Sequence, residues 1–230
     1  LGTGNTTDKT SPTQIVASGV VQVAGGYYHS LFLKSNGSLW AMGYNGNGQL
    51  GDGSTTQRNS PVQVVDANVT VPLAMYENSW FLKSDGTLWG MGKNVGSNWG
   101  DGTTADSPVP VQASITGVAA ISDRGYVHKT DGSLWRSYYS DWIQSVDANV
   151  TFVESGYRNT VFIKTDGSLW TMGSNSYGQL GDGTTTHRYS PVQILASGVT
   201  QIAAGSYHSL FLKSDGSLHA MGHNYYGQLG

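Results

Sequence analysis

Residues 29–53 read HSLFLKSNGSLWAMGYNGNGQLGDG, and close variants of this phrase recur along the chain. The shorter phrase Ser-Asn/Asp-Gly-Ser/Thr-Leu-Trp, or a close variant, occurs five times. Its glycines are Gly37, Gly86, Gly132, Gly167 and Gly216, at spacings of 49, 46, 35 and 49 residues. A period near 49 that contains several short strands is typical of the blades of a β-propeller.

The local sequence around each glycine predicts a β-hairpin. Residues 30–34 and 39–43 are short β-prone runs on either side of Asn36-Gly37, a pair that supplies the positive φ angles of a tight turn. The same turn is expected at Asp131-Gly132, although that repeat is degenerate. Residues 60–65, SPVQVV, are expected to form a further strand with its proline at the start. One such unit cannot bury both of its apolar faces, so neighbouring units must stack.

The two ends of the chain predict a closed ring. The chain stops within the repeat at GQLG, and residues 1–16 carry the missing part of the phrase. Counted through the two ends, Gly216 and Gly37 are 51 residues apart, which is one ordinary repeat. We therefore expect a single all-β domain over residues 1–230, a closed β-propeller of five blades with one shortened, in which the N-terminal segment completes the last blade and removes free sheet edges. The repeats fall at approximately 21–69, 70–117, 118–149, 150–198 and 199–230 plus 1–20.

The phrases G-x-x-H-S-L-F-L-K, L-W-x-M-G-x-N and G-Q-L-G-D-G-T-T resemble the repeats of the regulator of chromosome condensation family in its bacterial form. The resemblance covers essentially the whole chain and implies a propeller. That family includes nucleotide-exchange factors, protein inhibitors, chromatin binders and surface modules, so the resemblance does not select a function. Family members usually have seven blades, and the third repeat here lacks the G-Q-L-G-D-G-T-T phrase, so a fragment of a larger ring is the alternative.

Composition excludes several classes of partner. The net charge is −3 and the 12 Lys and Arg residues are scattered, which predicts no binding of nucleic acid. The chain has no cysteine, so disulfides and thiolate sites are excluded. It has no run of 18 apolar residues, so we expect no membrane insertion. Low charge with abundant Gly, Ser, Thr, Asn and Tyr resembles secreted bacterial repeat proteins. We expect an extracellular or cell-surface monomer.

Catalytic and metal sites have no support in the sequence. Seven of the 15 acidic residues directly precede a glycine in a repeated turn, and the repeated serines belong to the blade framework rather than to one special position. On a strand, His219 and His223 would lie about 13 Å apart, too far to share a metal ion. His219 stands where other repeats have Trp, which indicates a packing substitution, and His29 and His208 are expected to be hydrogen-bonded within their blades. We predict no catalytic residue, no metal and no cofactor.

Residues that vary within the constant framework are the better guide to a binding site. Equivalent loops of a propeller project to one face, so the residues before each first hairpin strand should share a rim. They are rich in Tyr and include one Arg, the residue types enriched at interface hot spots. The alternative is that these aromatic side chains pack on neighbouring blades. The predicted binding residues are Tyr27, Tyr28, Tyr76, Glu77, Tyr157, Arg158 and Tyr207. A second variable set follows the Trp-x-Met-Gly phrase and includes Tyr44, Lys93, Ser174 and His223.

Three functions remain open on the sequence. The first is a non-enzymatic module that presents the aromatic loop face to a protein partner. The second is a carbohydrate-binding propeller, because exposed aromatic rings beside Asn and Asp can bind a glycan. The third is a lyase-type enzyme, for which the third repeat holds the one polar cluster that is not repeated: Arg124, His128, Arg136, Tyr138, Tyr139, Asp141 and Trp142.

Overall fold

The computed structural model describes residues 2–94, 99–122, 125–138 and 141–230. Within these ranges every regular element is a β-strand. The part of the chain described here includes no helix that could cross a membrane. The all-β prediction is confirmed.

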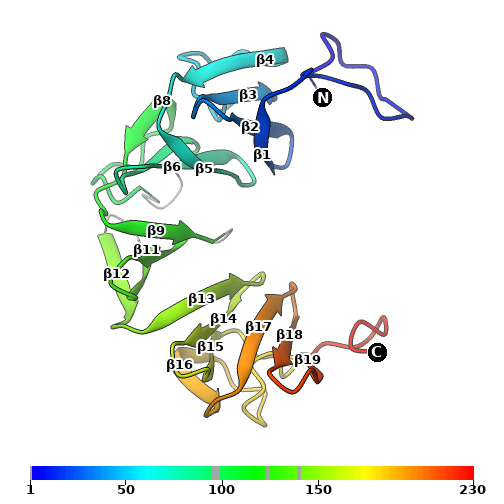
Figure 1. Ribbon diagram of the computed structural model, residues 1–230, viewed down its shortest axis with the longest axis vertical. Coiled ribbons are helices and arrows are strands. Elements are labelled where there is room, and N and C mark those ends of the chain that lie inside the picture. Colours follow the sequence, from blue (N-terminus) through cyan, green and yellow to red (C-terminus); the bar gives the residue numbers. More distant parts are fainter. Residues whose placement is uncertain (1, 95–98, 123–124, 139–140) are drawn as a thin grey trace. The chain divides into compact units, whose positions relative to one another are not determined.

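The strands form five antiparallel sheets in chain order, one for each predicted blade (Figure 1). Strand bounds in the first two sheets are β1 (Val20–Gly25), β2 (His29–Lys34), β3 (Leu39–Gly43), β4 (Arg58–Val65), β5 (Val69–Ala74), β6 (Asn78–Lys83), β7 (Leu88–Gly92) and β8 (Ser107–Gln112). The third and fourth sheets comprise β9 (Val118–Ile121), β10 (Tyr126–Lys129), β11 (Leu134–Tyr138), β12 (Asp141–Val146), β13 (Val150–Ser155), β14 (Asn159–Lys164), β15 (Leu169–Gly173) and β16 (Arg188–Leu195). The last sheet has β17 (Val199–Ala204), β18 (His208–Lys213) and β19 (Leu218–Gly222).

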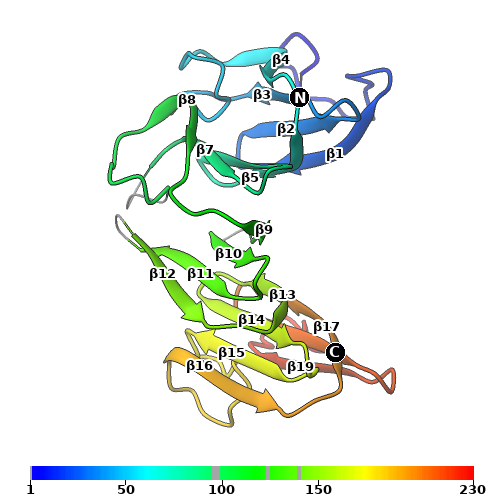
Figure 2. The same cartoon turned by 60° about the vertical axis from the view of Figure 1, so that its left-hand side comes forward.

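The chain falls into two compact units. The first comprises residues 1–118 and 137–142, and the second comprises residues 119–136 and 143–230. In the first unit the inner side chains of β2 and β3 pack against β5 and β6 through residues such as Leu31, Leu39 and Phe81. In the second unit the sheet of β13–β16 lies beside that of β17–β19 (Figure 2). Residues such as Val161 and Phe211 pack between the two sheets. Neighbouring repeats therefore stack within each unit, as a blade with two apolar faces requires.

The hairpin turns differ from the predicted type. Only the glycine of each Asn/Asp-Gly pair has positive φ, 79° at Gly37, and its N–H donates to the Lys34 carbonyl at 2.9 Å. The loop is therefore a turn closed by one left-handed glycine, and not a two-residue turn with both central residues at positive φ. Asn36 instead accepts hydrogen bonds from the N–H and hydroxyl of Ser38 through its side chain, which is the local bonding that favours Asn and Asp in turns.

The degenerate third repeat keeps its hairpin. Tyr126 pairs with Arg136 and His128 with Leu134 across the turn at Gly132, which confirms the prediction for Asp131-Gly132. The shortening falls in the connection to the outer strand: β11 ends at residue 138 and β12 begins at residue 141, whereas residues 44–57 separate β3 from β4. The blade has lost its long loop and kept four strands.

A cation–aromatic stack joins the two strands of the hairpins. In the first sheet Trp40 stacks on Phe32 with ring centroids 6.1 Å apart, and the Lys34 ammonium lies 4.4 Å from the Trp40 ring. In the last sheet His219 replaces the tryptophan and stacks on Phe211 at 4.8 Å with nearly parallel planes. The prediction that His219 is a packing substitution is confirmed.

The predicted closure of the ring concerns the last sheet and the N-terminal segment. The sheet of β17–β19 has three strands, residues 2–19 contain none, and Leu218 is 68% exposed. The N-terminal residues dock on the first sheet, where the Gly4 N–H donates to the Asn59 carbonyl at 2.8 Å and Gly2 lies against Met42. Closure of the ring stays a prediction.

Replacing Gly37 by Ala is expected to destabilise the fold about twice as much as replacing Gly216. Both glycines have positive φ, which costs an alanine about 1 kcal/mol. An added Cβ at Gly37 would also lie 2.8 Å from the backbone nitrogen of Asn68, whereas one at Gly216 meets nothing within 4 Å. Urea denaturation should give a loss of about 1 kcal/mol for G216A and about 2 kcal/mol for G37A. Equal losses would show that packing beside Gly37 is irrelevant.

Candidate functional site

The predicted binding residues lie in short loops that the framework holds by one repeated hydrogen bond. In each of four repeats, the residue just before the second strand of the sheet accepts a backbone hydrogen bond at its carbonyl. The donor is the residue that follows the Trp-x-Met-Gly glycine, or His219-x-Met-Gly in the last repeat. The four bonds are Tyr44 N–H to Tyr28, Lys93 to Glu77, Ser174 to Arg158 and His223 to Tyr207, at 2.7–3.0 Å.

The glycine between the two loops is required by this close approach. Gly43 has a φ of 111°, and a Cβ on it would lie 2.6 Å from the Tyr28 carbonyl oxygen. Gly173 and Gly222 have nearly the same φ, 111° and 112°. The backbone is therefore fixed while the flanking side chains are free to differ between repeats.

Tyr27, Tyr28, Tyr44 and Tyr76 form a first aromatic cluster in the first unit. Tyr27 stacks on Tyr76 and meets Tyr28 edge to face, both with ring centroids 4.3 Å apart. Hydrogen bonding to the Tyr27 side chain raises the pKa of both Tyr28 and Tyr76. Beside the cluster, Glu77 forms an ion pair with Lys93 at 2.5 Å. All four tyrosines are exposed.

Tyr157, Tyr177, Tyr207 and His223 form a second aromatic cluster in the second unit. Tyr207 lies 5.9 Å from Tyr157 and 5.4 Å from Tyr177, measured between ring centroids, and Tyr177 contacts His223 at 4.6 Å. The Arg158 guanidinium lies 5.3 Å from the Tyr157 ring. The seven predicted residues thus lie in two groups, Tyr27, Tyr28, Tyr76 and Glu77 in one unit and Tyr157, Arg158 and Tyr207 in the other.

Within each unit, residues of the two variable sets lie next to one another. Tyr28 meets Tyr44, Glu77 pairs with Lys93, and Tyr207 lies 6.4 Å from His223 between ring centroids. Each pair joins a residue of the first set to one of the second. The joint variation of both sets within a constant framework is the signal that could have identified this pairing from sequence.

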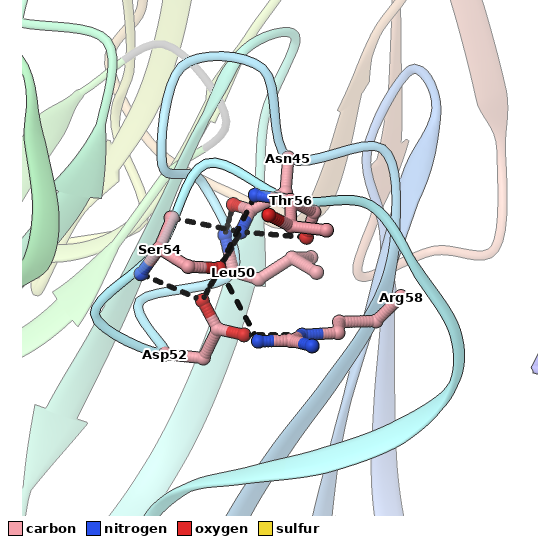
Figure 3. A network of polar contacts seen from close by, with 6 residues as sticks. All are labelled: Asn45, Leu50, Asp52, Ser54, Thr56 and Arg58. Atoms are coloured by element: carbon pink, nitrogen blue, oxygen red, sulfur yellow. Dashed lines mark hydrogen bonds and ion pairs between the residues drawn. The ribbon is translucent and has the colours of Figure 1, made fainter.

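A buried polar network holds the long loop that carries Tyr44 (Figure 3). The Asn45 side-chain amide donates to Asp52 at 3.1 Å and to the Ser54 and Thr56 carbonyls at 2.9 and 3.2 Å. Its side-chain oxygen accepts the Leu50 N–H at 2.9 Å. Asn175 makes the equivalent contacts in the fourth repeat. The repeated Asn is therefore the centre of the loop and not a ligand-binding residue.

The carboxylates of Asp52 and Asp182 in these loops form ion pairs with Arg58 and Arg188. Burial raises the pKa of Asp52, but hydrogen bonds from Arg58 and Ser54 outweigh it and lower that pKa below its ordinary value. The same opposition of burial and hydrogen bonds, with Arg188 and Thr184 as donors, lowers the pKa of Asp182 to about 2. These ionised and paired groups are unsuited to proton transfer near neutral pH.

A buried Ser-His contact below the first cluster is structural. His29 Nε2 lies 2.8 Å from Ser79 Oγ, but that hydroxyl donates to the Gln49 carbonyl at 2.8 Å, so His29 is the donor to Ser79 and cannot act as its base. Both residues are buried, and burial lowers the pKa of His29 to about 4. The contact joins two sheets, which corrects the prediction that His29 bonds within its own blade.

Two side chains of the polar cluster in the third repeat donate hydrogen bonds to backbone carbonyls. His128 Nε2 donates to the Val150 carbonyl at 2.6 Å, and Trp142 Nε1 donates to the Trp99 carbonyl at 3.4 Å. Tyr138 ends β11, Asp141 begins β12, and Arg136 lines a pocket of the second unit. Arg124 and Tyr139 lie outside the described residues.

Comparison with known proteins identifies the repeat. The family model "Regulator of chromosome condensation (RCC1) repeat" matches residues 1–33, 36–72 and 166–212, which together make up half of the chain. A second model of the same description matches residues 20–49, 150–179 and 199–228. None of the curated proteins matches the chain.

Solved structures of the same repeat type confirm the β-propeller class. Human WBSCR16 superposes with a TM-score of 0.74, a structure of Kap60 bound to yeast RCC1 (Prp20) with 0.72, and Prp20p from Saccharomyces cerevisiae with 0.68. Each is 20% identical, and each comparison covers 92% of this chain. The chain spans only 63%, 57% and 59% of those three chains, respectively.

Proposed function

Because the chain belongs to the regulator of chromosome condensation repeat family, we propose that it is a non-enzymatic interaction module whose two aromatic clusters bind a protein partner. The observation that carries this proposal is the exposure of the clustered rings. Tyr28 is 67% exposed and Tyr76 61%, although both lie in contact with further tyrosines. Contiguous exposed aromatic surface is typical of binding sites.

The alternative of blade packing is less well supported. Leu31 and Phe81, which pack in the core between two blades, are buried. The tyrosines of the clusters stay exposed, although Tyr27 stacks on Tyr76 of the next repeat. Because the Tyr28 and Tyr207 carbonyls are fixed by framework hydrogen bonds, the rings are presented at low entropic cost.

The structural relatives favour a protein over other ligands. Yeast RCC1 (Prp20) was solved in complex with Kap60, and Prp20p from Saccharomyces cerevisiae is described as binding Gsp1p and histones. A protein partner for this chain is our proposal by comparison with them. The proposed location outside a bacterial cell depends on composition alone.

Replacing Tyr28 or Tyr207 by Ala is expected to weaken partner binding by about 2 kcal/mol each, the usual scale for aromatic hot spots. A partner purified with the full chain is titrated against the wild type and both variants by calorimetry, and each variant is melted. Val23→Ala, an exposed apolar change outside both clusters, is the control and should bind normally. Folding should change little, because neither tyrosine is buried.

Two outcomes would contradict the proposal. Variants that melt early yet bind normally when folded would assign the tyrosines to packing, where the loss of a buried aromatic side chain costs about 3 to 5 kcal/mol of stability. Weak sugar sites repeated on a glycan array, with no protein partner, would favour the carbohydrate-binding alternative.

A further inference from the structure

A pocket of about 450 Å³ opens in the second unit beside the second aromatic cluster. It is formed where the loop before β14, the end of β15 and the start of β16 meet β10 and β11 of the preceding sheet. Its chemistry is set by Arg136, Arg158 and His187, with Tyr126, Tyr157 and Tyr189 as aromatic walls. No acidic side chain occurs among the described residues that line it.

Arg158 is the cation that this pocket leaves uncompensated. The ion pairs between described residues occupy Arg58, Arg188, Lys93 and Lys213, and none includes Arg158. Its guanidinium lies over the Tyr157 ring, which fixes its plane and leaves its N–H groups available. Arg136 makes an interaction of its own, so we assign one uncompensated charge to the pocket.

His187 adds a further donor. Its Nδ1 accepts the Asn175 N–H at 2.9 Å, so the N–H group of the ring is at Nε2. The guanidinium and the imidazole N–H that line this pocket both donate hydrogen bonds, which suits an oxygen-rich anion.

The equivalent place in the first repeat shows that this chemistry is not part of the framework. There a pocket of about 340 Å³ is lined by Tyr28 and Gln57, the counterparts of Arg158 and His187. The arginine that lines it, Arg58, is neutralised by Asp52. The donor set is therefore particular to the fourth repeat, as expected for a site rather than for blade structure.

We propose that this pocket binds a carboxylate side chain on an acidic segment of the protein partner, an inference that rests on the proposed function. The planar guanidinium of Arg158 matches a carboxylate through two parallel hydrogen bonds, and one uncompensated positive charge matches its single negative charge. The neighbouring tyrosines contact the rest of the segment.

The test uses the full chain and three fluorescent peptides that are identical except at a few fixed positions. These positions hold glutamate in the first peptide, glutamine in the second and phosphoserine in the third. Fluorescence anisotropy should show binding of the glutamate peptide and at least about tenfold weaker binding of the glutamine peptide. R158Q should lose about tenfold in affinity for the glutamate peptide. R158K keeps the positive charge but cannot form two parallel hydrogen bonds to a carboxylate. Its affinity for the glutamate peptide should lie between those of R158Q and the wild type.

K9Q serves as the control for this measurement. It removes an exposed positive charge elsewhere in the chain, so it should bind like the wild type. Equal affinity of the wild type for glutamate and glutamine peptides, or unchanged binding by R158Q at an unchanged melting temperature, would overturn the proposal. A clear preference for the phosphoserine peptide would replace the carboxylate by a phosphate.

Failure of this proposal is distinguishable from failure of the proposed function. If the natural partner loses affinity for Y207A and not for R158Q, the aromatic surface binds without the pocket. If neither change affects the partner, both are wrong.

Discussion

At pH 4 the protein is expected to be about 3 kcal/mol less stable to unfolding than at pH 7, because His29 is buried in its neutral form. Burial lowers the pKa of His29 to about 4, against an ordinary value of 6.5. As the pH falls through this window, the unfolded chain takes up a proton that the folded chain cannot, so unfolding is favoured. The loss is absent above pH 6.5 and is nearly complete at pH 4. Urea denaturation at four pH values between 4 and 7 measures it.

The repeats provide the control. Asn159 occupies the place of His29 in the fourth repeat and donates to Ser209 at 3.2 Å, as His29 does to Ser79. His29→Asn should therefore keep the contact between sheets and remove most of the pH dependence above pH 4. Below about pH 3.8 both proteins should weaken further, because Asp52 and Asp182 have lowered pKa values and are protonated first in the unfolded chain. The same slope between pH 4 and 6.5 in both proteins would contradict the assignment to His29.

Repetition made the fold predictable. The spacing of the turn glycines gave the number of sheets, and the residues around Asp131-Gly132 gave the hairpin of the degenerate repeat. The turn type was wrong, because Asn-Gly also suits a loop in which only the glycine is left-handed and the Asn side chain bonds locally. Sequence cannot separate these two loops, since both require the same residue pair.

The candidate site was only half accessible to sequence reasoning. Its loops followed from variation within the repeat, but the pairing of Tyr28 with Tyr44 depends on the approach of two backbones at Gly43. The stacking of Lys34 on Trp40 was missed for a similar reason. A contact between residues six apart can be predicted only when the hairpin register is known. The pocket around Arg158 needed side chains from two sheets, and sequence spacing does not show which sheets meet.

Asn45→Ala is expected to be among the most destabilising substitutions in the chain, with a loss of about 4 kcal/mol. The side chain is fully buried and bonds to Asp52, to two loop carbonyls and to the Leu50 N–H (Figure 3). Alanine leaves these groups without partners, and each unsatisfied buried group costs about 1 to 3 kcal/mol. The loop at residues 44–57 should open with it, which limited proteolysis would detect as new cleavage there.

Asn224 in the last repeat offers a matched control for this loss. Its side-chain oxygen accepts the Leu229 N–H at 2.9 Å, the same bond and the same distance as between Asn45 and Leu50, but at an exposed position where water can replace it. Asn224→Ala should therefore cost less than about 1 kcal/mol by urea denaturation. If the two substitutions cost the same, the stability of the loop does not depend on burial of its asparagine. A large loss of stability for Asn45→Ala alone would show that the repeated Asn supports the loop. The variable residue before it, Tyr44, is then free to serve in the binding surface.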